Sequence, residues 1–105
     1  MSYQPKLRPE LLDDVAEAFA WYQGRAAGLG HEFLRMYFAA IAGVARNPLL
    51  FQVVYADFRR ILLRRFPYVL YYRLERDTIV FFLLFHCARN PAVLRCELRN
   101  RRETA

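Results

Sequence analysis

The stretch FRRILLRRFPYVLYYRLERDTIVFFLLFHCAR, residues 58–89, decides the fold of this chain. Three runs within it are rich in the Ile, Val, Tyr and Phe that favour strands: 58–64, 68–75 and 78–86. Pro67 separates the first two runs, and Glu75-Arg76-Asp77 offers a polar turn between the second and the third. These residues therefore predict a sheet with three consecutive strands.

Two amphipathic helices are predicted upstream of these strands. The first begins at Pro9, a residue suited to an opening turn, and its apolar residues recur at intervals of three and four as far as Gly24. The second is predicted from His31 or Glu32 to about Arg46. Two such helices with a short glycine-containing link predict a helical hairpin laid on the sheet.

The two ends of the chain and its last strand complete the expected domain. Residues 3–8 are predicted to form a first strand, and Pro5 confines it to a sheet edge because proline has no amide hydrogen. The run 78–86 is apolar on both faces, which is typical of a central strand covered on both sides or of a partner interface. The arginine-rich tail after Pro91 is interpreted as a short helix or as a segment unordered until bound. The chain, residues 1–105, is expected to form one domain.

Positive charge dominates the composition. Sixteen Lys and Arg against ten Asp and Glu give a net charge of +6, and Lys6 is the only lysine. Arginine recognises phosphate and carboxylate through paired hydrogen bonds, so we expect an anionic or acidic partner. We also expect the guanidinium groups to converge at one rim of the sheet. A basic but merely solvated surface is the plain alternative.

Several protein classes are excluded by what the sequence lacks. Cys87 and Cys96 are too few and too irregularly placed for a disulfide framework or a zinc site, and we expect no metal and no other cofactor. The longest apolar run, 79–85, is far shorter than the ~20 residues that a membrane span requires. No leader sequence opens the chain, so a cytoplasmic protein is predicted.

Four segments in this order resemble the RelE/ParE superfamily of toxins from bacterial type II toxin–antitoxin systems, often labelled plasmid stabilisation proteins. They are RPELLDDVAEAFAWY (8–22), GLGHEFLRMYFAAIAGVARNP (28–48), FRRILLRRFPYVLYYRL (58–74) and IVFFLLFHCARNP (79–91). The last two keep the family's Phe-Pro-Tyr–x–x–Tyr-Tyr and His–x–x–Arg–x–Pro elements. The resemblance implies an α+β fold: an N-terminal strand and a two-helix hairpin packed on a mostly antiparallel sheet of about four strands. It also implies a cognate antitoxin that neutralises the toxin, with a toxin–antitoxin hetero-oligomer as a possible assembly.

The ParE-like branch of this superfamily inhibits DNA gyrase by binding and catalyses nothing. The elements Phe66-Pro67-Tyr68 and His86–x–x–Arg89 resemble this branch more closely than the other. Under this hypothesis the target-binding surface consists of arginines and one histidine: Arg59, Arg60, Arg64, Arg65, His86 and Arg89.

The RelE-like branch resembles ribosome-dependent mRNA endonucleases. Such cleavage requires a proton acceptor, a proton donor and cations around the phosphate. The candidates under this alternative are three phosphate-holding arginines and two proton-exchanging residues: Arg60, Arg64, Arg89, His86 and Tyr72. The chain departs from that branch at Leu62 and Val69, where lysine and arginine are usual. A third hypothesis is a basic nucleic-acid-binding module that uses its arginines on phosphates.

Several residues also have plain structural interpretations. His86 fits equally well a neutral imidazole that is hydrogen-bonded to the backbone. Trp21 and Tyr22 are predicted to pack the first helix on the sheet. The carboxylates of that helix are predicted to form a solvated stripe: Asp13, Asp14 and Glu17.

Overall fold

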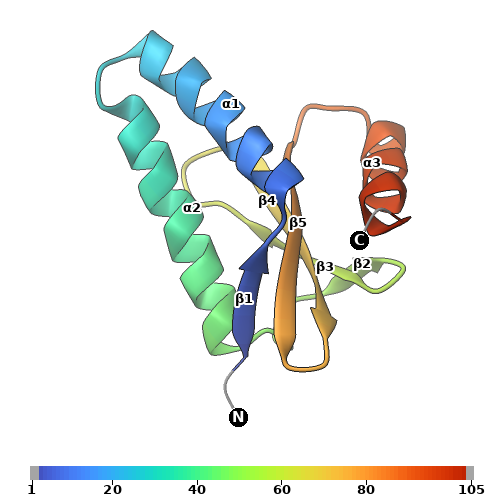
Figure 1. Ribbon diagram of the computed structural model, residues 1–105. Coiled ribbons are helices and arrows are strands. Elements are labelled where there is room, and N and C mark those ends of the chain that lie inside the picture. The colour runs from blue at the N-terminus through green and yellow to red at the C-terminus, as the bar shows by residue number, and fades with distance from the viewer. Residues whose placement is uncertain (1–2, 104–105) are drawn as a thin grey trace.

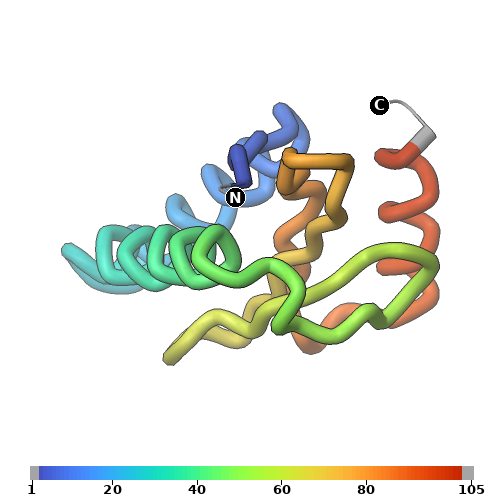
Figure 2. Tube along the Cα trace, turned by 90° about the horizontal axis from the view of Figure 1, so that it is seen from below, coloured from blue at the N-terminus to red at the C-terminus, as the bar shows by residue number. Residues whose placement is uncertain are grey.

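A single mixed sheet carries helices on both of its faces (Figure 1). The computed structural model describes residues 3–103, and the elements follow each other as β1 (Gln4–Leu7), α1 (Pro9–Arg25), α2 (Leu29–Arg46), β2 (Val53–Tyr55), β3 (Phe58–Leu62), β4 (Tyr68–Glu75), β5 (Thr78–His86) and α3 (Pro91–Glu103). The hairpin of α1 and α2 and the helix α3 lie on opposite sides of the sheet (Figure 2). The predicted α+β class is confirmed, and the arginine-rich tail is helical as far as Glu103.

The strand order is β1-β5-β4-β3-β2. Only β1 and β5 run parallel, so the sheet is mostly antiparallel, as predicted. It has five strands where about four were expected, because the three residues of β2 are too few to give a strand pattern in the sequence. A tight turn joins β2 to β3, and Ala56 in it has a positive φ of 50°.

The first strand covers only part of its neighbour. In the parallel register the last pair is Leu7 with Phe81, and the Arg8 amide donates to the Phe81 carbonyl at 3.2 Å. The chain then turns into α1 at Pro9, while β5 continues to His86. The second half of β5 therefore has no strand on that edge.

A bulge lies in the same part of β5. Tyr71 pairs with Leu83 but Tyr72 pairs with Phe81, so Phe82 is an extra residue in the ladder. Both Phe82 and Leu83 consequently face α3, and the usual alternation of side chains is interrupted. All of β5 except its two end residues is buried, which confirms the prediction of a central strand covered on both sides.

Aromatic side chains fill the core under the helical hairpin. Tyr22 is buried, stacks on Phe33 with 5.5 Å between ring centroids, and meets the edge of Phe66 at 4.8 Å. Trp21 was predicted to share this role, but it is 53% exposed. That prediction is wrong because the two neighbours project about 100° apart on a helix, so only one of them faces the sheet.

One ion pair joins α1, β5 and α3. The Arg101 Nη1 atom lies 2.7 Å from Asp14 Oδ2, Nη2 lies 3.1 Å from Oδ1, and Nη1 also donates to the Phe82 carbonyl at 2.8 Å. Asp14 Oδ2 accepts from the Leu84 amide at 3.1 Å. Burial lowers the pKa of the Arg101 guanidinium, but the Asp14 hydrogen bond and charge more than offset this, so the pKa lies above its ordinary value. The prediction of a solvated carboxylate is therefore wrong for Asp14.

Replacing Asp14 by alanine should lower the free energy of unfolding by about 2–3 kcal/mol, because it leaves both the Arg101 guanidinium and the Leu84 amide without this acceptor. Urea unfolding of the purified variant measures the change. Asp13→Ala is the matched control, since Asp13 is exposed on the same helix, and its effect should stay within about 0.5 kcal/mol. Equal effects of the two substitutions would contradict the assigned role of the ion pair.

Candidate functional site

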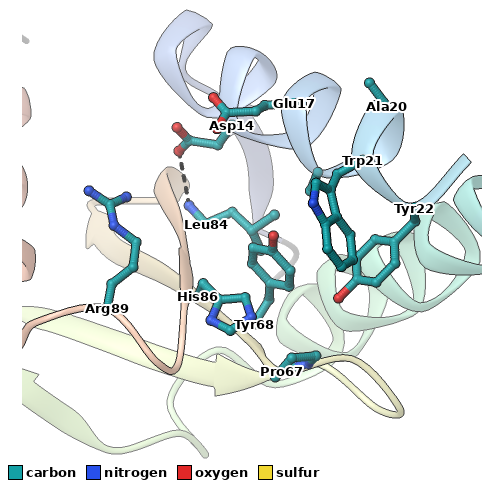
Figure 3. A pocket seen from close by; sticks show the side chains of 11 residues that line it. Asp14, Glu17, Ala20, Trp21, Tyr22, Pro67, Tyr68, Leu84, His86 and Arg89 are labelled. Atoms are coloured by element: carbon teal, nitrogen blue, oxygen red, sulfur yellow. Dashed lines mark hydrogen bonds between the residues drawn. The ribbon is translucent and has the colours of Figure 1, made fainter. Parts of the chain in front are cut away.

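A groove of about 820 Å³ opens beside the uncovered half of β5 (Figure 3). One wall is α1, and the other is formed by the start of β4, the end of β5 and the loop that follows it. The polar and aromatic side chains that line it are Asp14, Glu17, Trp21, Tyr22, Tyr68, His86 and Arg89. The groove exists because β1 ends opposite Phe81, midway along β5, and no local sequence pattern marks this register.

His86 is fixed by the backbone of its own loop. Its Nδ1 atom accepts a hydrogen bond from the Ala88 amide at 3.0 Å, so Nδ1 carries no proton in this arrangement. The imidazole also meets the Tyr68 ring edge-on, with centroids 5.0 Å apart. This geometry is the one expected of a neutral imidazole hydrogen-bonded to the backbone.

Tyr68 and Arg89 stand on either side of His86 (Figure 3). Burial raises the pKa of the Tyr68 hydroxyl, Tyr22 and Glu17 raise it further, and the positive charge of Arg89 acts in the opposite direction. The Arg89 guanidinium lies over the Phe85 ring, 4.6 Å from its centroid. The groove thus offers one guanidinium and one imidazole at the end of the sheet.

Two more of the predicted arginines lie at this end of the sheet. Arg64 and Arg65 occupy the loop between β3 and β4, and β4 begins where Tyr68 pairs with His86. Both are exposed, and Arg65 forms an ion pair with Glu32 of α2 at 3.2 Å. Of the six residues predicted to bind a target, the groove thus brings His86 and Arg89 together, and Arg64 and Arg65 lie in the loop that precedes Tyr68.

Arg59 and Arg60 lie elsewhere. Arg59 points toward the segment after α2, where its Nη1 atom donates to the carbonyls of Phe51 at 2.6 Å and Leu49 at 3.4 Å. Arg60, the next residue of β3, projects from the opposite face and lies beside Tyr71. The predicted convergence of guanidinium groups at one rim thus fails for these two, because neighbouring residues of a strand face opposite ways.

Tyr72 is part of the core. It is 0% exposed, its hydroxyl donates to the Pro48 carbonyl at 2.7 Å, and burial raises its pKa to about 12. The five residues proposed for nuclease chemistry are therefore not in one place: His86 and Arg89 line the groove, Arg64 lies nearby, Arg60 projects from the other face of the sheet, and Tyr72 is enclosed.

A second groove, of about 350 Å³, lies between α1 and α2 and is almost entirely apolar. Leu12 and Phe38 on its rim are 50% and 56% exposed. The hydroxyl of Tyr37, which also lines this groove, is buried and has no hydrogen-bond partner within residues 3–103. Its pKa is raised to about 12 by burial and by the charge of Asp14. Part of the apolar surface of the two helices thus lies outside the core.

Metal-binding clusters and membrane-spanning helices are both absent from the described part of the chain. Within residues 3–103 no group of three or more His, Cys, Asp or Glu side chains is placed to hold a metal ion. None of the described helices has the length and apolarity needed to cross a membrane.

Tyr72 and Tyr37 are both buried, and removal of their hydroxyl groups should affect the free energy of unfolding differently. Tyr72→Phe should lower the free energy of unfolding by about 1 kcal/mol, since it removes the bond to the Pro48 carbonyl. Tyr37→Phe should be neutral or stabilising, because the hydroxyl that it removes has no partner. Urea unfolding of both variants measures the difference, and a larger loss for Tyr37→Phe than for Tyr72→Phe would contradict the assigned contacts.

Comparison with known proteins identifies the family. The model of the family described as "ParE toxin of type II toxin-antitoxin system, parDE" matches residues 6–91. A solved structure described as the chromosomal ParDE TA system from P. aeruginosa has the same fold, with a TM-score of 0.71, 11% identity, and coverage of 81% of this chain and 96% of that chain. No curated protein matches the sequence. Since the family model spans well over half of its length, the chain belongs to the ParE toxin family of type II toxin–antitoxin systems.

Proposed function

We propose that this protein is a growth-inhibiting toxin that binds DNA gyrase and blocks it without catalysing a reaction, and that a cognate antitoxin neutralises it. The observation that carries the proposal is the match to the ParE toxin model over residues 6–91. Gyrase, messenger RNA and a bacterial antitoxin all occur in the cytoplasm, so we propose that the protein acts there.

The placement of the candidate residues supports binding rather than cleavage. A nuclease requires a proton acceptor, a proton donor and cations within reach of one phosphate. Tyr72 is enclosed in the core and already donates to the Pro48 carbonyl, while Arg60 projects from the other face of the sheet. A binding surface has no such requirement, because each of its side chains can contact a different part of the partner.

We propose that the target-binding surface is the sheet end that carries Arg64, Arg65, His86 and Arg89. The first two are exposed in one loop and the last two line the groove beside it, so a single partner can contact all four. Arg60 is exposed and extends this set on the other face. Arg59 supports the proposed target-binding surface only indirectly, because its guanidinium donates to two backbone carbonyls and so holds the segment after α2.

The apolar groove between α1 and α2 supports the presence of an antitoxin. Leu12 and Phe38 leave a large apolar area in contact with water beside this groove. The net charge of +6 favours an acidic partner, whose approach it accelerates. We propose that an acidic, amphipathic segment of the antitoxin covers this groove, with its apolar side chains against Leu12 and Phe38.

The RelE-like alternative keeps one observation in its favour. The groove beside β5 brings His86, Tyr68 and Arg89 together, which are residue types able to exchange a proton and hold a phosphate. The interaction of His86 Nδ1 with the Ala88 amide leaves the other ring nitrogen for such a role. The following experiment separates the two functions.

Purified protein should inhibit the supercoiling activity of DNA gyrase and leave messenger RNA intact in a translating extract. Relaxed plasmid, ATP and gyrase give the first readout on an agarose gel, and primer extension on a translated message gives the second. Cleavage at codon boundaries with normal supercoiling would overturn the gyrase proposal in favour of the nuclease.

Replacing Arg64 and Arg89 together by alanine should raise the concentration needed for half-maximal gyrase inhibition at least about tenfold, because both guanidinium groups belong to the proposed contact surface. The same variant should relieve growth arrest when its expression is induced in a bacterial host. The matched control is Arg35→Ala with Arg46→Ala, which removes the same charge from exposed positions of α2. Equal weakening by both double variants would indicate a general charge effect and contradict the assigned surface.

A further inference from the structure

We propose that two copies of this chain associate through the outer edge of β2, so that their two sheets join into one. β2 is the last strand in the order β1-β5-β4-β3-β2, and no strand of residues 3–103 lies on its other side (Figure 1). An edge strand presents backbone N–H and C=O groups with which a further strand can pair. This surface is separate from the groove beside β5, so the inference is independent of the proposed target.

The segment that leads into β2 exposes apolar side chains. Four large ones lie within six positions and are 37–71% exposed: Leu49, Leu50, Val53 and Val54. Arg59 holds this segment against the sheet, since it pairs with Val53 and its guanidinium donates to the Leu49 carbonyl. The apolar side chains are therefore fixed beside the open strand. We call residues 49–54 the β2 edge.

Charge indicates which partner fits the β2 edge. Residues 47–56 contain no charged side chain, although 25% of the chain is charged. Arg59 lies beside this segment but already donates to its backbone carbonyls. An acidic segment of an antitoxin would thus gain no free positive charge here and would place its carboxylates against apolar side chains. A second copy of the chain instead brings an equally apolar and uncharged segment.

The opposite edge of the sheet is protected in a way that β2 is not. β1 carries Pro5, which lacks an amide hydrogen, and the exposed Lys6, whose charge disfavours association of strand edges. The three residues of β2 are Val-Val-Tyr, with neither proline nor charge. Since natural proteins usually protect their free edges, an apolar edge without such protection indicates an interface.

A two-fold axis beside Val53 and Val54 gives both copies the same contacts. Two identical strands related by such an axis run antiparallel, and their backbone groups can pair directly. Each copy then removes the apolar side chains of the other from water. Because the same surface is used on both copies, the assembly closes at two chains and does not grow into a fibre.

The test is sedimentation equilibrium of the purified full-length protein between about 1 and 200 µM. The weight-average mass of the unaltered protein should rise from that of one chain, 12.5 kDa, toward twice this value. The edge variant carries Leu50→Lys and Val53→Lys, which bring like charges together across the two-fold axis. The matched control carries Leu12→Lys and Phe38→Lys, which add the same charge at exposed apolar positions of α1 and α2.

A second edge variant guards against misfolding of the first. Gln52 is polar and exposed, so Gln52→Lys leaves the core untouched and still places a charge in the β2 edge. Circular dichroism and urea unfolding establish that each variant is folded. Hydrogen exchange adds a readout of strand pairing, because the amides of residues 52–55 should exchange more slowly at high than at low concentration of the unaltered protein.

We expect the dissociation constant to increase at least about tenfold in both edge variants. In the control it should change by less than about twofold, because added charges far from the contact are screened. A mass of one chain over the whole range would overturn the proposal and leave this edge to another partner, such as a strand of the antitoxin. A dimer that the edge variants retain, or that the control loses equally, would also overturn it, as would association without slower exchange at these amides.

Discussion

The structure depends on how the backbone groups in the uncovered half of β5 find hydrogen-bond partners. A buried strand edge without partners is costly, because each backbone group that loses water must find another partner. Here β1 ends at Leu7, and side chains take over: Asp14 accepts from the Leu84 amide, and Arg101 donates to the Phe82 carbonyl. Since Asp14 and Arg101 also bind each other, one pair of charges joins the first helix, the central strand and the last helix.

This arrangement creates the groove. A full-length first strand would occupy the space beside β5, and the side chains of α1 would then face another strand. The edge of β5 is instead hydrogen-bonded by side chains at only a few backbone groups. The wall formed by α1 therefore stands apart from the end of the sheet and leaves Tyr68, His86 and Arg89 accessible. The hydrogen bonds from Asp14 and Arg101 stabilise the edge of β5 without covering it with a strand. The residues proposed to contact a target are therefore left exposed.

Helices on both faces of one sheet give the protein several separate surfaces. The hairpin of α1 and α2 presents an apolar groove, and the end of the sheet presents Arg64 and Arg89. Distinct surfaces allow the proposed antitoxin and the proposed target, which differ in chemistry, to be bound separately. Packing against the sheet keeps these surfaces in fixed relation, as the buried Leu98 does for α3.

The sequence by itself determined the elements and the chemistry. Strand-forming runs, helix stripes and the prolines predicted the α+β class, the edge position of the first strand and the central position of β5, because these depend on local periodicity and on hydrogen-bonding capacity. The motif order predicted the toxin family. Only the tertiary structure decided which side chains meet. It turned Arg59 and Arg60 to opposite faces, enclosed Tyr72, and placed the half-buried Asp14 against Arg101, which lies 87 residues away. The contact of Asp14 with the strand edge depends on the register in which β1 pairs with β5, ending with Leu7 opposite Phe81, and local periodicity does not encode that register.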